Sequence, residues 1–406
     1  MHTNNRMKQV CLVSPVSIRE IDARLEALSV HREGRAIMNR KAVFYTFRIT
    51  SLSAPAANIL KQEALAAGAE LATAWSVIKA PDTISDALLM GTYRQIGLIM
   101  DKIASQQFGL PAIADELRTA LDNLFQEHRT LRCRATTLDF SGRPKLMGIL
   151  NVTPDSFSDG GLFFSPEAAV EHGLALCGEG ADLLDIGGES TKPGSAPVSA
   201  EEEKRRIIPV IRELRKRVGI PLSVDTTKAA VAAEALENGA DIVNDISAMT
   251  IDPGMSGVVK KFGAGVVLMH MQGTPATMQS NPSYTDVVLE VLSYLEERAR
   301  YAISEAGIDR ECIAVDPGIG FGKTIDHNLA LLKDIRAFRT LGFPVLAGTS
   351  RKSFIGRLTG TDTGERVPGS LATAVWAATH GVDIIRVHDI RETKQALSMI
   401  NHILDA

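Results

Sequence analysis

The chain has 406 residues, of which 45% are hydrophobic, and it carries a formal net charge of -4 with a sequence pI near 6.2. This length predicts two or three domains with sizeable cores, and the charge gives no electrostatic footprint for nucleic acid. The apolar stretches are too short to span a membrane, the N-terminus lacks a signal-peptide core, and the four cysteines show neither metal-binding nor disulfide spacing. We therefore expect a cytoplasmic protein that binds neither nucleic acid nor a membrane.

Residues 1 to about 140 predict a small α+β domain. The stretches VFYTFRITSLS, ELATAWSVI and DALLMG have the pattern of strands, and SAPAANILKQEALAAG and TYRQIGLIMDKIASQ have the pattern of helices. The resulting order, βαββα, indicates helices on one face of a sheet. This region has no metal spacing, glycine fingerprint or acid-base pair, so we interpret it as a packing, oligomerisation or regulatory module. The polar segment 129–144 is predicted to be a linker, which divides the chain into domains 1–140 and 141–406.

From Leu146 onward one pattern recurs, in which an apolar strand is followed by a loop and an amphipathic helix. Glycine just past a helix favours helix termination, and Gly180, Gly239 and Gly381 each stand directly before a new apolar run. The strand candidates are LMGILNV, LLDIG, LSVDT, IVNDI, VVLMHM, IAVDP, VLAGTS and IIRVH. Eight such units over about 260 residues predict a (β/α)8 TIM barrel, and a doubly wound open sheet is the alternative.

Nearly every predicted strand ends in a side chain with useful chemistry. In a closed barrel these ends converge on one mouth, where the active sites of this fold lie. The residues are Asn151, Glu189, Asp225, Asn244, His270, Asp316, Lys352, Arg386 and His388.

The segment DPGIGFGKT, residues 316 to 324, is similar at first sight to a phosphate-binding P-loop. That motif requires G-x-x-x-x-G-K-[ST], but Pro317 occupies the place of the first glycine and has no N–H to offer an anion. The sequence therefore argues against a P-loop and directs attention to Asp316.

Seven motifs together resemble the dihydropteroate synthase family. They are MGILNVTPDSFSDGG (147 to 161), DIGGESTKPGS (185 to 195), SVDT (223 to 226), VNDISA (243 to 248), DPGIGFGKT (316 to 324), GTSRKSFIG (348 to 356) and IIRVHDI (384 to 390). The resemblance covers about 265 residues and implies a transferase of folate biosynthesis. Such an enzyme joins 6-hydroxymethyl-7,8-dihydropterin pyrophosphate to p-aminobenzoate and releases pyrophosphate.

The resemblance assigns pterin binding to Asp225, Asn244, Met269, Asp316 and Lys352. A pterin presents an amino group and a ring N–H side by side, and one carboxylate can accept both hydrogen bonds, which suits Asp316. Asp225 corresponds to a carboxylate that stabilises positive charge on the dihydropterin as pyrophosphate leaves. The resemblance implies that Asp225 and Lys352 are catalytic, together with Asp159.

The leaving pyrophosphate requires cations and hydrogen-bond donors. Arg386 and His388 stand two residues apart at the last strand, so both side chains point to one face. The resemblance adds Asn151, which is expected to hold the Mg2+ cofactor together with the pyrophosphate, and Thr191 with Lys192. Lys192 stands where the family usually has arginine, and lysine keeps the positive charge but lacks bidentate geometry.

For p-aminobenzoate, the resemblance implies contacts from Phe157 and Pro193 on two loops, and from Ser353 with the substrate carboxylate. Ser353 is predicted to lie at a helix N-terminus, where unpaired N–H groups favour anions. His270 is interpreted as a pocket wall or packing residue beside Met269. The partners are therefore expected to be these two small-molecule substrates, and the family resemblance implies a homodimer.

Two alternatives remain open from the sequence. A folate-dependent methyltransferase with a related pterin-binding barrel would also use Asp225, Asn244 and Asp316, but it would not need the TSRKS and R-x-H motifs. A non-catalytic pterin-binding protein would not need the anion pocket of the leaving group.

Overall fold

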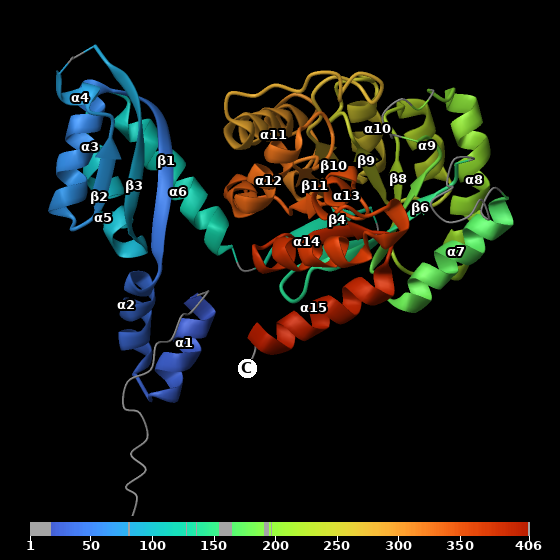
Figure 1. Cartoon of the computed structure of the whole chain (residues 1–406), viewed down its shortest axis with the longest axis horizontal. Helices are drawn as coiled ribbons and strands as arrows, with labels where there is room; N and C mark the ends of the chain where they lie inside the picture. Colours follow the sequence, from blue (N-terminus) through green and yellow to red (C-terminus); the bar gives the residue numbers. More distant parts are fainter. Residues whose placement is uncertain are drawn as a thin grey trace, which may run out of the picture. The chain divides into compact units, whose positions relative to one another are not determined.

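The computed structural model describes residues 18–79, 82–126, 128–134, 136–153, 165–190, 195 and 197–404 (Figure 1). The chain divides into two compact units, Met1–Asp122 and Asn123–Ala406, here called the N-terminal unit and the barrel unit. Each is described by itself. Among the residues that the structure describes, no helix is long and apolar enough to cross a membrane.

The N-terminal unit contains a three-stranded antiparallel sheet in the order β1-β3-β2. The predicted βαββα order is confirmed by β1, α3, β2, β3 and α5, but WSVI is not a strand, because β2 ends at Thr73 and α4 follows. The sequence prediction also missed α1, α2 and α6. The elements are α1 (Ile18–Ala27), α2 (Arg32–Ala42), β1 (Phe44–Ser53), α3 (Ala54–Ala66), β2 (Glu70–Thr73), α4 (Ser76–Lys79), β3 (Ile84–Thr92), α5 (Tyr93–Ile103) and α6 (Leu110–Phe125).

Two strands of this sheet run directly into helices without a loop. Ser53 is the last residue of β1, and its side chain accepts a hydrogen bond from the Ala56 amide at the start of α3. Thr92 likewise ends β3 and forms a capping box with Gln95 of α5. Because each hydroxyl satisfies a helix N–H group that has no partner within its helix, these residues fix where strand becomes helix.

Residues 129–144 do not form the predicted linker. They contain an antiparallel hairpin of β4 (Thr130–Cys133) and β5 (Thr136–Asp139), which contacts β10 and β11 of the barrel. Leu131, Cys133 and Leu138 are buried in one cluster with the barrel residues Met147 and Val267. The barrel unit therefore starts before the predicted boundary at residue 140, and the linker prediction is wrong because alternate residues of this polar segment are apolar and find a surface to cover.

The barrel unit contains eight parallel strands in the order β11-β10-β9-β8-β7-β6-β13-β12. A parallel bridge between Val315 and Val345 joins the two ends of that order, so the sheet curls into a nearly closed barrel and the open-sheet alternative is wrong. All eight predicted strands are confirmed. They are β6 (Lys145–Asn151), β7 (Leu183–Gly187), β8 (Leu222–Asp225), β9 (Ile242–Asp245), β10 (Gly265–Met269), β11 (Ile313–Asp316), β12 (Leu346–Ala347) and β13 (Ile384–Val387).

Helices follow each strand and surround the sheet (Figure 1). They are α7 (Pro166–Glu179), α8 (Ala200–Arg217), α9 (Ala229–Glu237), α10 (Met255–Phe262), α11 (Val287–Ser304), α12 (Ile325–Lys333), α13 (Ser353–Thr359), α14 (Val367–Thr379) and α15 (Ile390–Leu404). The predicted helix ends are confirmed: Gly180, Gly239 and Gly381 all have positive φ, which glycine adopts without a Cβ penalty.

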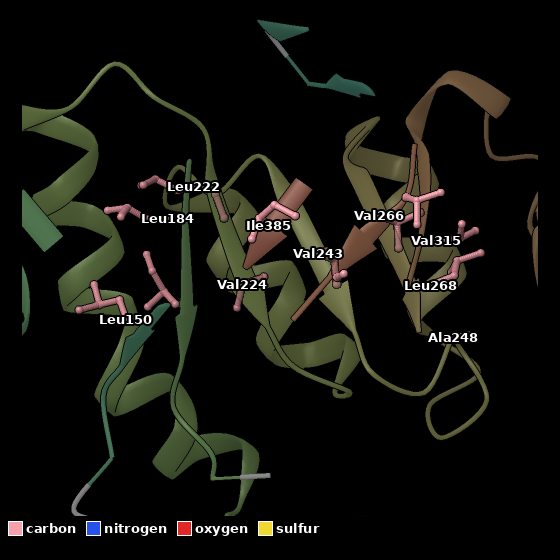
Figure 2. Packing of buried hydrophobic residues seen from close by; sticks show 14 of the residues in the cluster. Leu150, Leu184, Leu222, Val224, Val243, Ala248, Val266, Leu268, Val315 and Ile385 are labelled. Carbon is pink, nitrogen blue, oxygen red and sulfur yellow. The ribbon is translucent and has the colours of Figure 1, made fainter. Parts of the chain in front are cut away.

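Successive side chains of each strand point alternately toward the surrounding helices and into the barrel, so apolar residues form one cluster on each side of the sheet. Leu150, Leu184 and Val224 belong to the large cluster shared with the helices, and Figure 2 labels them among its members. The residues that alternate with these side chains point into the barrel. Its base is apolar and is formed with the hairpin by Met147, Leu183, Ile242, Val267, Ala314, Leu346 and Ile384. Among the described residues, packed side chains therefore close the amino end of the barrel, and its carboxyl end is where a ligand is expected.

The hairpin plug gives a prediction on stability. We expect Leu131→Ala, at a side chain with no exposed surface, to lower the free energy of unfolding of the barrel by about 2–5 kcal/mol because it leaves a cavity under the strands. Leu329→Ala is the matched control, since Leu329 is 41% exposed on α12. Chemical denaturation measures both, and equal losses from the two variants would mean that the hairpin is not part of the barrel core.

Candidate active site

The carboxyl ends of four neighbouring strands carry one row of aligned residues. Asn151 pairs in register with Gly187, Gly187 with Asp225, and Asp225 with Asn244. A Cβ on Gly187 would lie 3.5 Å from the Asp225 Cβ and 3.8 Å from Asn151 Oδ1. Because Gly187 has no side chain, it leaves space between Asn151 and Asp225 at the barrel mouth.

Arg386 of β13 forms ion pairs with two aspartates from other strands. Its Nε donates to Asp185 Oδ2 at 2.6 Å, and its Nη2 donates to Asp225 Oδ2 at 2.9 Å. Asp185 has no exposed surface. A buried carboxylate is tolerated when it is paired and hydrogen-bonded, so Arg386 stabilises the negative charges that lie below the mouth.

Asn244 extends this network and leaves acceptors for a ligand. Its Nδ2 donates to Asp185 Oδ2 at 2.9 Å, and Asn244 itself is only 4% exposed. Asp185 Oδ1 and Asn244 Oδ1 are buried and have no hydrogen-bond partner within the described part of the chain. Buried acceptors without partners are costly, so a bound molecule that donates hydrogen bonds would stabilise both.

The charge state of Asp225 is set by its surroundings. Burial, followed by the negative charge of Asp185, raises the pKa of Asp225 to about 7, and the Arg386 guanidinium opposes this rise. Asp225 therefore changes its charge near neutral pH, which suits a group that must respond to charge developing in a substrate.

Asp316 closes β11 and is 6% exposed. The Gly318 amide donates to its Oδ1 at 2.7 Å, and burial raises the pKa of Asp316 to about 6 despite that bond and the Lys352 charge. Gly318 has φ +67°, and an added Cβ would lie 1.9 Å from the His270 carbonyl oxygen. Only glycine fits this turn, so the backbone there fixes the direction of the Asp316 carboxylate.

Lys352 lies after β12 and directly precedes α13. Its Nζ is 4.1 Å from the centroid of the Phe321 ring, which is a cation–π distance. Burial lowers the pKa of Lys352 to about 8, with a further contribution from Arg386, while Asp316 and Asp225 oppose the change. Asp225, Asp316, Lys352 and Arg386 thus lie near enough to influence one another's charge.

His388 follows β13 and is held by Ser350. Its backbone N–H donates to Ser350 Oγ at 3.2 Å, and Ser350 Oγ lies 3.0 Å from His388 Nδ1. Because the hydroxyl accepts from the amide, its own proton can go to Nδ1. Next to this pair, Arg351 forms an ion pair with Asp389 at 2.5 Å, which joins the loops after β12 and β13.

The predicted site residues fall into two groups. The structure places Asn151, Asp225, Asn244, Met269, Asp316, Lys352, Ser353, Arg386 and His388 at or just beyond strand ends. Asn151 and Ser353 are exposed, and Ser353 is the first residue of α13 as predicted. Phe157, Asp159, Thr191, Lys192 and Pro193 lie outside the described residues, so their roles stay predictions.

His270 is buried and has the packing role that was predicted. Its ring makes an edge contact with Tyr294 at 4.9 Å between centroids. Burial lowers the pKa of His270 to about 3, with a further contribution from Lys323, so the imidazole is neutral at physiological pH.

Glu189, another predicted strand-end candidate, is turned away from this cluster. Its Oε2 accepts from Lys228 Nζ at 2.6 Å, and its Oε1 accepts from the Val198 amide at 2.9 Å. Lys228 also donates to the fully buried Glu203 at 2.6 Å. Glu189 therefore fastens the backbone at Val198 and does not belong to the Arg386 network.

The sequence prediction missed two residues of the site, Asp185 and Lys323. Asp185 stands inside the apolar strand LLDIG, and an aspartate in the middle of a buried strand is a signal that was available. Lys323 is 3% exposed and hydrogen-bonds His270 Nδ1 at 3.0 Å. It belongs to the DPGIGFGKT segment, in which the prediction gave a role to Asp316 but considered the lysine only as that of a P-loop.

Among the residues that the structure describes, no group of three or more histidine, cysteine, aspartate or glutamate side chains could hold a metal ion. Asn151 offers one amide oxygen beside the space left by Gly187. Mg2+ is commonly bound by one or two protein oxygens together with substrate phosphates, and the residues present fit that mode rather than a resident ion held by protein alone.

The fold and site define the class of protein. A family model of pterin binding enzymes matches residues 147–388, which include every site residue described above. The chain therefore belongs to the pterin-binding enzymes, and the comparisons below place it among the dihydropteroate synthases, which are transferases.

Three relatives illustrate the similarity. The dihydropteroate synthase of Escherichia coli (strain K12) is 47% identical over 277 residues, covering 68% of this chain and 97% of the relative. The Xanthomonas albilineans dihydropteroate synthase with 4-aminobenzoic acid has a TM-score of 0.64 at 47% identity and covers 69% of this chain and 99% of its own. The same enzyme in complex with 7,8-dihydropteroate has a TM-score of 0.62 at 46% identity, covering 68% and 99%.

These coverages also bear on the N-terminal unit. The relatives are matched almost completely, whereas about two thirds of this chain is used. The chain is longer than these relatives, which is consistent with an extra N-terminal region. The family match begins only at residue 147.

The Arg386 network gives a prediction on charge. We expect Asp185→Asn to lower the pKa of Asp225 by about one unit or more, because it removes the negative charge next to Asp225 and leaves Arg386 paired with Asp225 alone. Carbon-13 NMR titration of the Asp225 carboxyl, assigned with Asp225→Asn, measures the shift.

The control is Asp182→Asn, which removes a carboxylate just before the amino end of the same strand, where it pairs with Arg143. This change should leave the Asp225 titration where it is. An Asp225 pKa that stays constant or rises in Asp185→Asn would contradict the assigned network.

Proposed function

We propose that this chain condenses 6-hydroxymethyl-7,8-dihydropterin pyrophosphate with p-aminobenzoate to give 7,8-dihydropteroate and pyrophosphate. The observation that carries the proposal is the polar layer directly above the apolar barrel base, in which Asp185, Asp225 and Asp316 are interleaved with Lys352 and Arg386. The dihydropteroate synthases to which the chain is similar include an enzyme crystallised with 7,8-dihydropteroate.

Recognition of the pterin would fall to Asp316 and Asn244. The pterin amino group and adjacent ring N–H form a planar donor pair, and an ionised Asp316 carboxylate can accept both bonds. One Asp316 oxygen already accepts from Gly318, but a carboxylate oxygen has room for a second donor. Asn244 Oδ1 and Asp185 Oδ1, which lack partners within the described residues, supply further acceptors.

The chemical step forms a C–N bond between the aniline nitrogen and the pterin methylene carbon, and it breaks the C–O bond to pyrophosphate. Positive charge that develops on the dihydropterin would be stabilised by Asp225, whose carboxylate lies beside Arg386. Because Asp225 has a pKa of about 7, it can also accept a proton near neutral pH. No covalent intermediate with the protein is required.

The leaving pyrophosphate would be held by Arg386 and His388. Arg386 donates through Nε and Nη2 to the two aspartates, and its guanidinium has five N–H donors in all, so the anion would use the remaining ones. Ser350 orients His388 through the contacts described above. Thr191 and Lys192 remain predicted contributors to this anion site.

We propose Mg2+ as the cofactor, bound by Asn151 and the pyrophosphate. Such an ion would neutralise charge on the departing anion. Asn151 lies in register with Gly187 and across from Asp225, so its amide oxygen is at the mouth.

For p-aminobenzoate we propose Ser353 at the start of α13 as the carboxylate contact, next to the pterin residue Lys352. Phe157, Pro193 and Asp159 remain predictions for the loops. A cytoplasmic location, an absence of nucleic-acid and membrane partners, and assembly as a homodimer also remain predictions, and light scattering of the full chain tests the last of these.

The direct test is to incubate the purified protein with the pterin pyrophosphate, p-aminobenzoate and Mg2+ and to follow 7,8-dihydropteroate by chromatography. Product formation with one pyrophosphate released per dihydropteroate supports the proposal. Pterin binding without turnover would instead favour a non-catalytic pterin-binding protein, and methyl transfer from a methylated folate would favour a methyltransferase.

Asp316 provides the sharpest test of pterin recognition. We expect Asp316→Asn to weaken binding of a pterin analogue by several kcal/mol, roughly the cost of facing a donor with a donor in a buried site. Isothermal titration calorimetry measures the affinity, with Asp389→Asn as a control carboxylate that pairs with Arg351 outside the pterin contacts. Equal affinities of Asp316→Asn and the unchanged protein would remove Asp316 from the pterin site.

The N-terminal unit contributes no residue to this assignment. We therefore expect a protein that begins at Asn123 to retain turnover per folded molecule, whereas one that begins at Ser141 loses the β4–β5 hairpin and should be markedly less stable. Turnover is measured together with circular dichroism and thermal unfolding. A well-folded 123–406 protein without activity would show that the N-terminal unit completes the site.

A further inference from the structure

Lys323 is a buried lysine for which the proposed reaction has no role. It follows β11 in the loop that begins at Asp316, and it is 3% exposed. Its Nζ lies 3.0 Å from His270 Nδ1, 2.9 Å from the Phe321 carbonyl oxygen and 3.4 Å from the His270 carbonyl oxygen. These partners are all acceptors that suit an ammonium group, and none of them carries a formal negative charge.

The contacts define the state of His270. When Lys323 is protonated, its ammonium group only donates hydrogen bonds, so Nδ1 of His270 accepts and the ring proton is on Nε2. The Tyr294 and Tyr284 rings pack against the imidazole, with centroids at 4.9 and 6.0 Å. His270 is thus a rigid neutral acceptor for Lys323 and not a second cation.

Lys323 and Asp316 carry opposite charges at the two ends of one loop. Burial lowers the pKa of Lys323 to about 7, the Asp316 charge opposes that fall, and Lys352 adds to it. Seen from Asp316, the positive groups are Lys352, Lys323 and Arg386, in that order of effect, besides the Gly318 amide. Lys352 and Arg386 come from the ends of β12 and β13, whereas Lys323 is the cation on the β11 side.

The loop between the two residues is fastened along its length. Gly318, Gly320 and Gly322 all have positive φ, at 67°, 85° and 61°. The Gly320 amide donates to Asn328 Oδ1 at 2.7 Å, and Tyr284 donates its hydroxyl to the Gly322 carbonyl at 2.8 Å. Asp316 binds the amide of Gly318 at one end, and Lys323 binds the carbonyl of Phe321 at the other.

We propose that Lys323 is a positioning residue for Asp316, the carboxylate that is proposed to bind the pterin. Held by His270 and the Phe321 carbonyl, its ammonium group favours the ionised form of Asp316 and fixes the 316–323 loop, so that the Asp316 carboxylate is presented to the barrel mouth. The inference deepens the proposed function and rests on it where pterin binding by Asp316 is concerned. The effect of Lys323 on the pKa of Asp316 in the ligand-free protein does not depend on the identity of the substrate.

The sign of the effect follows from the charges. A nearby cation favours an ionised carboxyl and lowers its pKa, so removal of Lys323 must raise the pKa of Asp316. The pterin N–H donors need the ionised carboxylate, so pterin affinity is lost as the pH falls through the Asp316 pKa. Because this pKa is higher in the variant, the variant loses its affinity at a higher pH. Lys352 and Arg386 remain and limit the shift.

The test uses Lys323→Met, which removes charge and hydrogen bonds, and Lys323→Gln, which keeps an N–H donor without the charge. Lys333→Met on the exposed face of α12 is the matched control. Carbon-13 NMR titration of the full-length ligand-free protein, with the Asp316 signal assigned by Asp316→Asn, measures the pKa of the Asp316 carboxyl group. This pKa should rise by roughly half a unit to one unit in both Lys323 variants and should not change in the control.

Calorimetry with a pterin analogue gives the second readout. Near pH 5, below the Asp316 pKa of both proteins, we expect about threefold to tenfold weaker binding in Lys323→Gln, and a larger loss in Lys323→Met. The pH at which affinity is lost on the acid side should rise by the same amount as the Asp316 pKa. The KM for p-aminobenzoate should not change. A general folding defect would lower the concentration of active enzyme, but it would not change the pH at which pterin affinity is lost.

The outcomes separate the inference from the proposed function. If the unchanged protein does not bind the pterin, the proposed function fails, while the Asp316 titration still tests Lys323. If the unchanged protein binds and a folded Lys323 variant has the same Asp316 pKa and loses pterin affinity at the same pH, the positioning role is wrong. Should Lys323→Met not fold, Lys323→Gln alone decides, and an unfolded Gln variant would also overturn the role because it would make Lys323 a folding residue.

Discussion

The ion pairs of Arg386 with Asp185 and Asp225 are the interaction on which the rest of the site depends. Charges this deep in a protein are tolerated only when they are paired and hydrogen-bonded, and removal of one partner leaves the other uncompensated. Asp185 in turn accepts from Asn244, so residues of four strands are joined by two carboxylates and one guanidinium. The network keeps the mouth polar and organised before any substrate arrives.

That arrangement requires an apolar barrel base. The β4–β5 hairpin places Leu131, Cys133 and Leu138 against inward side chains such as Met147 and Val267, which excludes water from the amino end. Asp185 and Asp316 are the next inward-pointing residues of their strands, two positions beyond the apolar Leu183 and Ala314. The dry base and the buried position raise the pKa values of Asp225 and Asp316, which become responsive near neutral pH, where their charge can be controlled by a bound pterin.

The sequence predicted most of the barrel because its signals are local. Each strand is a short apolar run, its end carries a polar residue, and glycines such as Gly180 and Gly239 mark the helix ends. What it could not provide depends on contacts between distant segments. The 129–144 segment is polar enough to read as a linker, and its burial depends on the base of a barrel formed much later in the chain. Lys323 was missed for a similar reason, since only the fold brings it to His270. Asp185 could have been found as the one charged residue of an apolar strand, although its pairing with Arg386 could not.

The central claim is that buried, partly protonated carboxylates at the barrel mouth become ionised when they receive the donors of a pterin. Proton exchange on binding measures this directly: a 6-substituted pterin is titrated into the full-length protein at pH 6 in two buffers with different ionisation enthalpies. Because the pKa values of Asp316 and Asp225 are about 6 and about 7, the account predicts a net release of protons into the buffer, and a smaller release in Asp316→Asn. Binding without proton exchange, or with proton uptake, would contradict it.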